Sequence, residues 1–151
     1  MINTILQGIV DTLYSLYGGT IPIYTSQQKQ GFEAPCFFVE FIDSQLIPEL
    51  KGHYVRNLSF QISYITTFDE GDSVDYKDLY AQLAPLELGL ETLKLRTGDI
   101  IRGEDISSTI DEALHIHITY PDRFYIPPPK GVFMETCLLY TSPSPRDRSL
   151  S

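Results

Sequence analysis

Apolar residues recur along the chain at two spacings, and each spacing predicts its own kind of element. Between residues 2 and 17 they follow steps of three and four, with polar residues such as Asn3 and Asp11 on the opposite face. Gly18 and Gly19 come next, and glycine takes the left-handed helix cap at little conformational cost. We therefore expect an amphipathic helix over residues 2–17.

Two later segments alternate with period two, as strands with one buried face do. In residues 54–66 the alternating apolar positions are Leu58, Phe60, Ile62 and Tyr64. In residues 113–120 they are Leu114, Ile116, Ile118 and Tyr120. Each set is predicted to point into the core from one face of a sheet.

The run over 36–42 is apolar at almost every position, which is typical of a strand that is covered on both faces. We expect a strand over 36–43 that forms a long hairpin with 54–66, the two being joined by a loop over 44–53. A further strand is expected near 100–110.

A short strand over 21–25 contains Pro22, which confines it to a sheet edge or a strand start. A second helix should follow the turn over 69–73, capped by Asp72 or Ser73. Its predicted apolar face consists of Tyr76, Leu79, Tyr80 and Leu83. Pro85 is expected to break or kink this helix, and the pattern over 86–95 fits either a helix or a strand.

Helices that are segregated from strands in sequence predict an α+β fold. We expect a mainly antiparallel sheet with a long central hairpin and two main helices packed on one side. By length, residues 1–136 make a single domain.

The last residues of the chain differ from the rest. Residues 137–147 back-translate onto one DNA string that resembles a transposon adapter used in sequencing-library preparation. We therefore expect 137–151 to be an artefactual, disordered tail, with the natural C-terminus missing after about Thr136. A natural tail rich in Ser and Pro is the alternative that the composition allows.

Deleting residues 137–151 should leave the thermal unfolding midpoint unchanged within error, because nothing in the preceding strand pattern requires them. Thermal melts of the full and shortened chains, followed by circular dichroism, measure this. A drop of several degrees in the shortened chain would show that the tail packs on the domain.

The chain is acidic, with a formal net charge of −9, or −10 when Arg146, Asp147 and Arg148 are left out. Such a domain is poorly suited to gripping nucleic acid, whose affinity comes mainly from Lys and Arg on phosphates. No stretch approaches the length of a membrane span, and the start lacks the pattern of a signal peptide. Because Cys36 is the one cysteine before the tail, we expect a soluble intracellular chain without a disulfide.

Histidines are the candidate metal ligands. His115 and His117 share one face of a predicted strand, and His53 or a distant carboxylate could complete a site. No third or fourth ligand has a telling spacing. We therefore expect these histidines at a surface or a subunit contact, without a bound metal.

Cys36 is the candidate nucleophile, but it lies in an apolar run with no base placed beside it, so we expect a small buried hydrophobe. The acids between Asp69 and Asp75 lack the spacing of a calcium loop. The sequence also lacks a glycine-rich phosphate loop and a nucleophile elbow. We predict no enzyme, no cofactor and no catalytic residue.

The expected loop over 44–53 carries Leu46, Ile47 and Leu50 where solvated residues would be normal. Clustered exposed apolar groups usually mark a contact. Arg56 interrupts an apolar strand face nearby and could pair with an acidic residue of a neighbour. We predict that these four residues form a subunit interface.

Several segments, taken in order, resemble the tail terminator family of long-tailed bacteriophages and related prophages. They are residues 1–10, the strand at Tyr24, residues 30–38 with their Pro-Cys-Phe-Phe strand start, and residues 54–64, 99–103, 114–120 and 134–135. The resemblance covers nearly all of residues 1–136. It rests on the order and spacing of these segments, because each alone is a short strand pattern.

The resemblance implies a structural protein of the virion tail, assembled in the host cytoplasm. Tail terminators form a ring, commonly a hexamer, on the head-proximal end of the tail tube. They stop tube polymerisation and present a surface to the head-side neck protein. DNA passes through the ring without specific binding, which an acidic chain suits. The family brings no catalytic residue and no membrane partner.

Pro85 is a departure from the family, because it interrupts a helix that looks continuous in relatives. Two alternatives stay open at this point. Another neck or head-completion adaptor would share the small size, ring assembly and fold, and the gene neighbourhood would distinguish it. A small metal-dependent enzyme using His115 and His117 is the other, and metal analysis of the purified protein would decide it.

Overall fold

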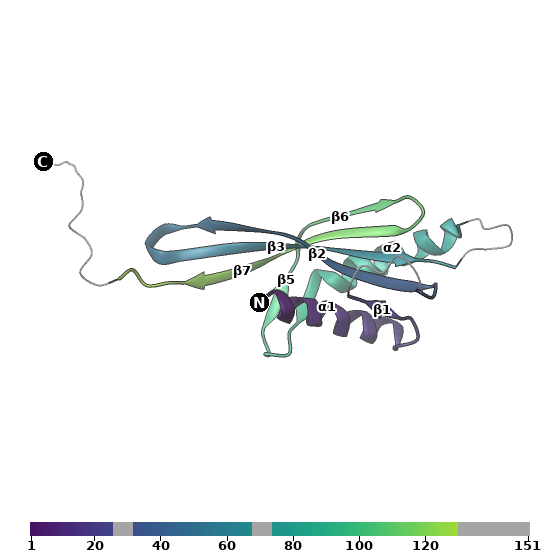
Figure 1. Cartoon of the computed structure of the whole chain (residues 1–151), viewed down its shortest axis with the longest axis horizontal. Helices are drawn as coiled ribbons and strands as arrows, with labels where there is room; N and C mark the ends of the chain where they lie inside the picture. Colours follow the sequence, from purple (N-terminus) through teal and green to yellow (C-terminus); the bar gives the residue numbers. More distant parts are fainter. Residues whose placement is uncertain (26–31, 68–73, 130–151) are drawn as a thin grey trace, which may run out of the picture. The chain divides into compact units, whose positions relative to one another are not determined.

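The computed structural model describes residues 1–25, 32–67 and 74–129 (Figure 1). The chain divides into two compact units. The main unit comprises Met1–Ile47 and Val55–Arg123, and the second unit comprises Pro48–Tyr54 and the chain from Phe124 onward. The predicted caps Asp72 and Ser73, and the predicted tail over 137–151, lie outside the described residues. A single domain over 1–136 stays a prediction.

Five strands form the principal sheet in the order β1-β2-β3-β7-β6. Their bounds are β1 Ile23–Tyr24, β2 Cys36–Pro48, β3 His53–Ile65, β6 Glu104–Ile110 and β7 Leu114–Tyr125. β1 runs parallel to β2, and β6 is antiparallel to β7. Between β3 and β7, Ser59 bonds Thr119 and Ser63 bonds His115, so residue numbers run in opposite directions and this pair is also antiparallel.

Two helices, α1 (Ile2–Tyr17) and α2 (Tyr76–Glu91), pack on one face of this sheet (Figure 1). A small second sheet pairs β4 (Thr92–Lys94) with β5 (Ile100–Arg102) in antiparallel fashion. Gly18 ends α1 in the left-handed conformation, with φ 67°, as the sequence predicts. The α+β class, the mainly antiparallel sheet and the first helix are therefore confirmed.

The alternating positions of the two predicted strands face the helices. All eight side chains are buried and belong to one apolar cluster with Ile5, Ile9 and Leu13 of α1 and Leu79, Leu86 and Leu90 of α2. Burying Leu, Ile or Phe stabilises a fold by about 1.5–3 kcal/mol each. This cluster is what holds the helices to the sheet.

The predicted loop over 44–53 is largely wrong. β2 continues to Pro48 and β3 begins at His53, so the connection is short and contains the 3-10 turn η1 (Leu50–Gly52). The reason is that the second half of β2 is exposed on both faces. Without a buried face, a strand leaves no alternation in the sequence.

The predicted break at Pro85 is also wrong, since α2 is continuous through it. Proline removes the N–H that would bond the carbonyl of Ala81. Both residues are exposed, so water can satisfy that carbonyl. Meanwhile Leu86 and Leu90 bury the second half of the helix, which outweighs the missing bond.

The N-cap and the apolar face of α2 differ from the prediction as well. Asp75 is the cap, and its carboxylate accepts a hydrogen bond from the backbone N–H of Asp78. Leu79 is buried, and Leu83 packs against the core. Tyr76 and Tyr80, predicted on the apolar face, are instead exposed.

The strand expected near 100–110 is two strands in two sheets. The chain leaves β5 and enters β6 at Gly103, whose N–H donates to the carbonyl of Glu91. A Cβ at this position would meet Ile118 and Tyr120, so the close approach requires glycine. The closing strand is longer than the predicted 113–120, because β7 continues through Pro121 to Tyr125.

A polar network fastens α2 to β3 and α1. The hydroxyls of Tyr64 and Thr66 donate to one oxygen of Asp78, at 2.7 and 2.5 Å. Gln82 donates to the other oxygen and accepts from the hydroxyl of Tyr17. Burial by itself would raise the pKa of Asp78, but the bonds from Thr66, Tyr64 and Gln82 outweigh it and hold the pKa below 3.8.

Asp78→Asn should lower the free energy of unfolding by about 1–3 kcal/mol at pH 7, because three bonds lose their charged acceptor. A carboxyl whose pKa falls on folding adds stability above its unfolded pKa and loses it as pH falls through the folded value. The difference between wild type and variant should therefore shrink below about pH 4. Urea unfolding at pH 7 and in acid measures it, and a pH-independent difference would contradict the network.

The second unit contains the η1 turn and the chain from Phe124, near the end of β7, onward. The N–H of Ile126 donates to the carbonyl of Gly52, which has φ 80°. A Cβ at Gly52 would collide with the Ile126 carbonyl. The ring of Tyr54 stacks on that of Phe124, with centroids 5.4 Å apart. The turn is thus held by its own backbone bond and aromatic pair.

Candidate functional site

Three of the four residues predicted as a subunit interface are exposed, and the four do not share one loop. Leu46 and Ile47 lie on β2 and are 50% and 37% exposed, while Leu50 begins η1 and is 84% exposed. Arg56 is half-buried on β3 and already takes part in an interaction within the chain. Exposure of the three apolar side chains is what a contact surface needs. Their role as an interface stays a prediction.

β2 changes character along its length. Residues 36–39 are buried, whereas every residue from Phe41 to Pro48 is exposed. The predicted covering of both faces over 36–42 is therefore confirmed for the first four residues and wrong for Phe41 and Ile42. The second half of β2 presents apolar side chains to solvent on both of its faces, which is unusual for a strand on a protein surface that contacts no partner.

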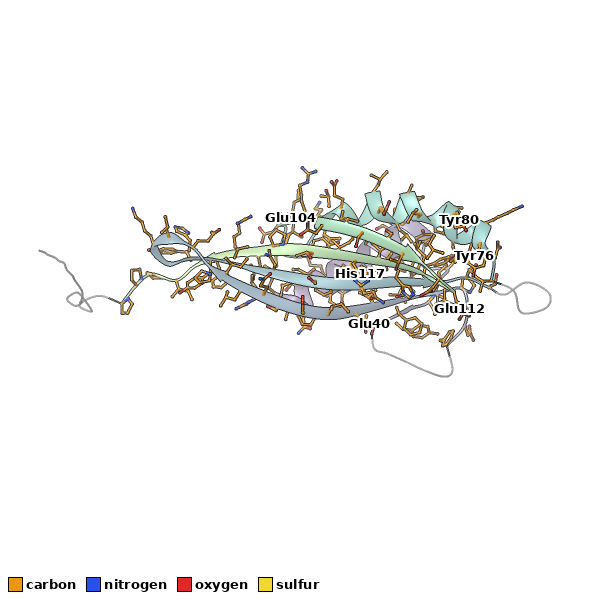
Figure 2. All side chains as sticks on the ribbon, turned by 90° about the horizontal axis from the view of Figure 1, so that it is seen from above. Glu40, Tyr76, Tyr80, Glu104, Glu112 and His117 are labelled. Atoms are coloured by element: carbon orange, nitrogen blue, oxygen red, sulfur yellow. The ribbon has the colours of Figure 1, made fainter. Side chains whose placement is uncertain are left out.

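The sheet face opposite the helices carries polar side chains along β3, β6 and β7, and Figure 2 labels His117 among them. Its positions alternate with those of the apolar core along β3, β6 and β7, and they include Ser59, Gln61, Ser63, Ser107, Thr109, His115, His117 and Thr119. These residues carry hydroxyl, amide and imidazole groups. Arg123, near the end of β7, is an arginine at a position of the same alternation. Glu40 of β2 lies on the same face (Figure 2).

His115 is held by its neighbours on this face. Its Nδ1 lies 2.7 Å from Oγ of Ser63 and 3.3 Å from Nε2 of Gln61, and its Nε2 lies 3.2 Å from Asp111. The backbone N–H of Ala113 chiefly holds the pKa of Asp111 below its usual value. His117 is exposed and stands opposite Ser107 in the sheet register.

The three histidines are divided between the two units. His53 lies in the second unit, where its ring contacts Tyr125 at a centroid distance of 4.8 Å. Across the described ranges, no group of three or more His, Cys, Asp or Glu side chains could hold a metal ion. His115 and His117 do share one strand face, as the sequence predicts.

Purified protein should hold no stoichiometric zinc or manganese after dialysis. Both ring nitrogens of His115 already have polar partners, and the described residues offer no third metal ligand beside His115 and His117. Elemental analysis of the dialysed protein measures this. Metal that survives dialysis, and that is lost in His115→Ala but kept in His117→Ala, would revive a metal-dependent activity.

Cys36 is fully buried at the start of β2. Burial raises the pKa of its thiol above the ordinary value, which keeps it protonated at neutral pH. A nucleophilic cysteine needs the opposite shift. The side chain packs as a small apolar residue, in line with the prediction.

A family model described as Phage tail terminator protein matches residues 4–130. The match takes in nearly all of the secondary structure, from the first turn of α1 to the end of β7. The chain belongs to the phage tail terminator family. This family consists of structural proteins of the phage tail that act with other tail components. No curated protein matches the chain.

Because tail terminators act with other tail components, the exposed surfaces of this chain are its candidate functional sites. No helix in the described parts of this tail terminator is long and apolar enough to cross a membrane. The surfaces that can meet other tail components include the exposed half of β2 and a second one that the sequence did not reveal.

That second surface lies on α2, where Tyr76, Tyr80 and Leu88 are 44%, 61% and 75% exposed. The rings of Tyr76 and Tyr80 are 6.3 Å apart. Sequence reasoning assigned the tyrosines to the core, because they follow the same helical spacing as Leu79 and Leu83. The spacing of seven and four between Leu79, Leu86 and Leu90 marks the true core stripe and was the available signal.

Proposed function

We propose that this tail terminator assembles as a ring, as a hexamer in the commonest arrangement, on the head-proximal end of the tail tube. The ring ends tube polymerisation and presents its other side to the head-side neck protein. The family match over residues 4–130 is the observation that carries this proposal. Its partners are copies of itself, the tail tube protein and the neck protein.

The exposed apolar side chains support an assembling role. Leu46, Ile47 and Leu50 would be buried against a neighbour in the ring, as the sequence predicts. Clustered exposed apolar groups usually mark protein contacts. Cyclic contacts between two different patches of the same chain close into a ring when the rotation permits.

The polar sheet face supports a passage for DNA. Affinity for DNA comes mainly from Lys and Arg on phosphates, and hydroxyl groups alone bind the backbone weakly. A ring that turned the face bearing Ser59, Gln61 and His117 toward its lumen would let the genome pass without holding it. The net charge of −9 also weakens binding to DNA, because both carry negative charge.

Assembly in the host cytoplasm and residence in the virion tail follow from this role. Gold-labelled antibody against an epitope tag on the chain should mark one end of purified tails, and the neck between head and tail in whole particles. Untagged particles serve as the control. Label on free heads but not on free tails would instead identify a head-completion adaptor.

A further inference from the structure

We infer that each subunit continues its sheet into the next one, the outer edge of β6 pairing with the outer edge of residues 41–47 of β2 in a neighbouring copy. This rests on the ring of the proposed function and names the contact that closes it. The occupant of each edge is a second copy of this chain.

The first edge is β6, the terminal strand of the five-stranded order. It bonds β7 on one side, and the order places no described strand on the other. Soluble proteins usually protect such an edge with lysine, proline or an inward-pointing charge. The stretch Ile106-Ser107-Ser108-Thr109-Ile110 has none of these. The irregular part lies at the start of the strand, where the register shifts between Glu104 and Ser107 and Asp105 has φ 52°.

The second edge is on β2. β1 is the neighbour of β2 on its outer side, but it pairs only with Phe37 and Phe38. From Phe41 to Ile47 the sheet places β3 on one side of β2 and no described strand on the other. All seven residues are exposed, Phe41, Ile42, Leu46 and Ile47 among them. β6 also has seven residues, so the two edges match in length.

The order of the sheet sets the direction of the contact. β2, β3, β7 and β6 are four successive strands, and each runs opposite to the one before, the short η1 turn making β2 and β3 a hairpin. With an even number of alternating strands, the last runs opposite to the first. Copies related by rotation about a ring axis therefore bring β6 beside β2 in antiparallel orientation.

α2 provides a surface on which β2 of the neighbouring copy can pack. It lies along the β6 edge (Figure 2), and Ser108 of β6 donates to Glu87 of α2 at 2.6 Å. A shallow depression there is lined by Glu87, Leu88, Glu91 and Ile106. Because side chains alternate, Phe41 and Ile47 of the added strand would face the helix side of the sheet. They would cover exposed apolar surface such as Leu88 while losing their own exposure.

Cysteine cross-linking in assembled tails tests the pairing. Ser107→Cys is combined in turn with Ile42→Cys, Ser44→Cys and Leu46→Cys, because these residues of β2 would lie on the same face of the continued sheet as Ser107. Cys137 is replaced by serine, and Cys36 is buried and stays. The four strand positions that receive a cysteine, Ile42, Ser44, Leu46 and Ser107, are all exposed. Variants are assembled under reducing conditions in a phage lacking its own copy of the gene, and purified tails are then oxidised. Each single-cysteine variant is the matched control.

One of the three pairs should give a ladder of multimers on a non-reducing gel, because facing residues of neighbouring strands lie close enough for a disulfide. Single variants should give dimers at most. Within one subunit β2 and β6 are separated by β3 and β7, so an internal bond cannot form. If Ser107 pairs with residue n, Thr109→Cys should cross-link to n−2; a link to n+2 would mean parallel strands and overturn the inferred geometry.

Two negative results are distinguishable. Variants that are present in tails of normal length but give no ladder from any of the three pairs would refute the edge pairing and leave the ring untouched. Absence of the chain from tails, for the unmodified protein as well as for the variants, would refute the proposed function instead. Thermal melts of the single variants should match that of the wild type, which excludes misfolding as the cause.

Discussion

Leu46→Asp combined with Leu50→Asp should produce over-long, headless tails while the chain itself stays folded. Both leucines are exposed, at 50% and 84%, so neither substitution disturbs the core. In the ring, each aspartate would have to be buried against a neighbour without a partner, and an unpaired buried charge is strongly unfavourable. Without a closed ring, tube subunits continue to add. Electron microscopy of lysates measures tail length.

The matched control is Tyr14→Asp combined with Ile100→Asp. These residues are similarly exposed, at 62% and 67%, and lie outside β2 and η1. This variant should give tails of normal length with heads attached. Normal tails and full infectivity from the Leu46 and Leu50 variant would show that this segment is not a subunit contact.

Phe60→Ala should cost about 3–5 kcal/mol, the range for removing a buried aromatic ring. Phe60 is fully buried on β3, and its ring contacts those of Phe41 and Tyr120 at centroid distances of 5.5 and 6.1 Å. Small domains are stable by only about 5–15 kcal/mol, so this loss unfolds many of them. Urea unfolding of the purified variant measures it.

Gln61→Ala is the control for that experiment, since Gln61 is the next residue but lies on the polar face. It loses weak hydrogen bonds to Ser63 and His115, at 3.2 and 3.3 Å, which is about 1 kcal/mol or less. Equal losses from the two substitutions would mean that the facing of β3 is wrong, because neighbouring strand residues point to opposite faces.

The parts of the fold that the sequence predicted are those with one buried face. The alternation through Leu58 and Phe60, and that through Ile116 and Ile118, identified both central strands and their core side. The helix over 2–17 was readable for the same reason. Burial imposes a period on the sequence, and the period then reports the element.

The parts of the fold that could not be predicted lack such a hydrophobic period. Residues 44–48 form a strand because they continue the ladder with β3, although nothing buries them in the single chain. Leu46 and Ile47 therefore looked like loop residues. Pro85 misled in the opposite way, since local propensity argued for a break that the burial of Leu86 and Leu90 prevents.

The candidate site likewise has features that the sequence predicts and features that it does not. Exposure of Leu46, Ile47 and Leu50 could be anticipated from apolar residues in a polar stretch. The free edge of β6 could not, because an edge is a property of strand order and no residue pattern reports it. The exposed Tyr76 and Tyr80 carried the spacing of a core stripe, and only the packed structure shows which stripe is buried.

Tail length in the absence of the chain tests the central claim most directly. A phage or prophage with this gene deleted should release headless tails of variable length beyond the normal value, and supplying the wild-type chain from a plasmid should restore one length and joined heads. Tails of normal, uniform length in the deletion strain would contradict a role in ending tail polymerisation.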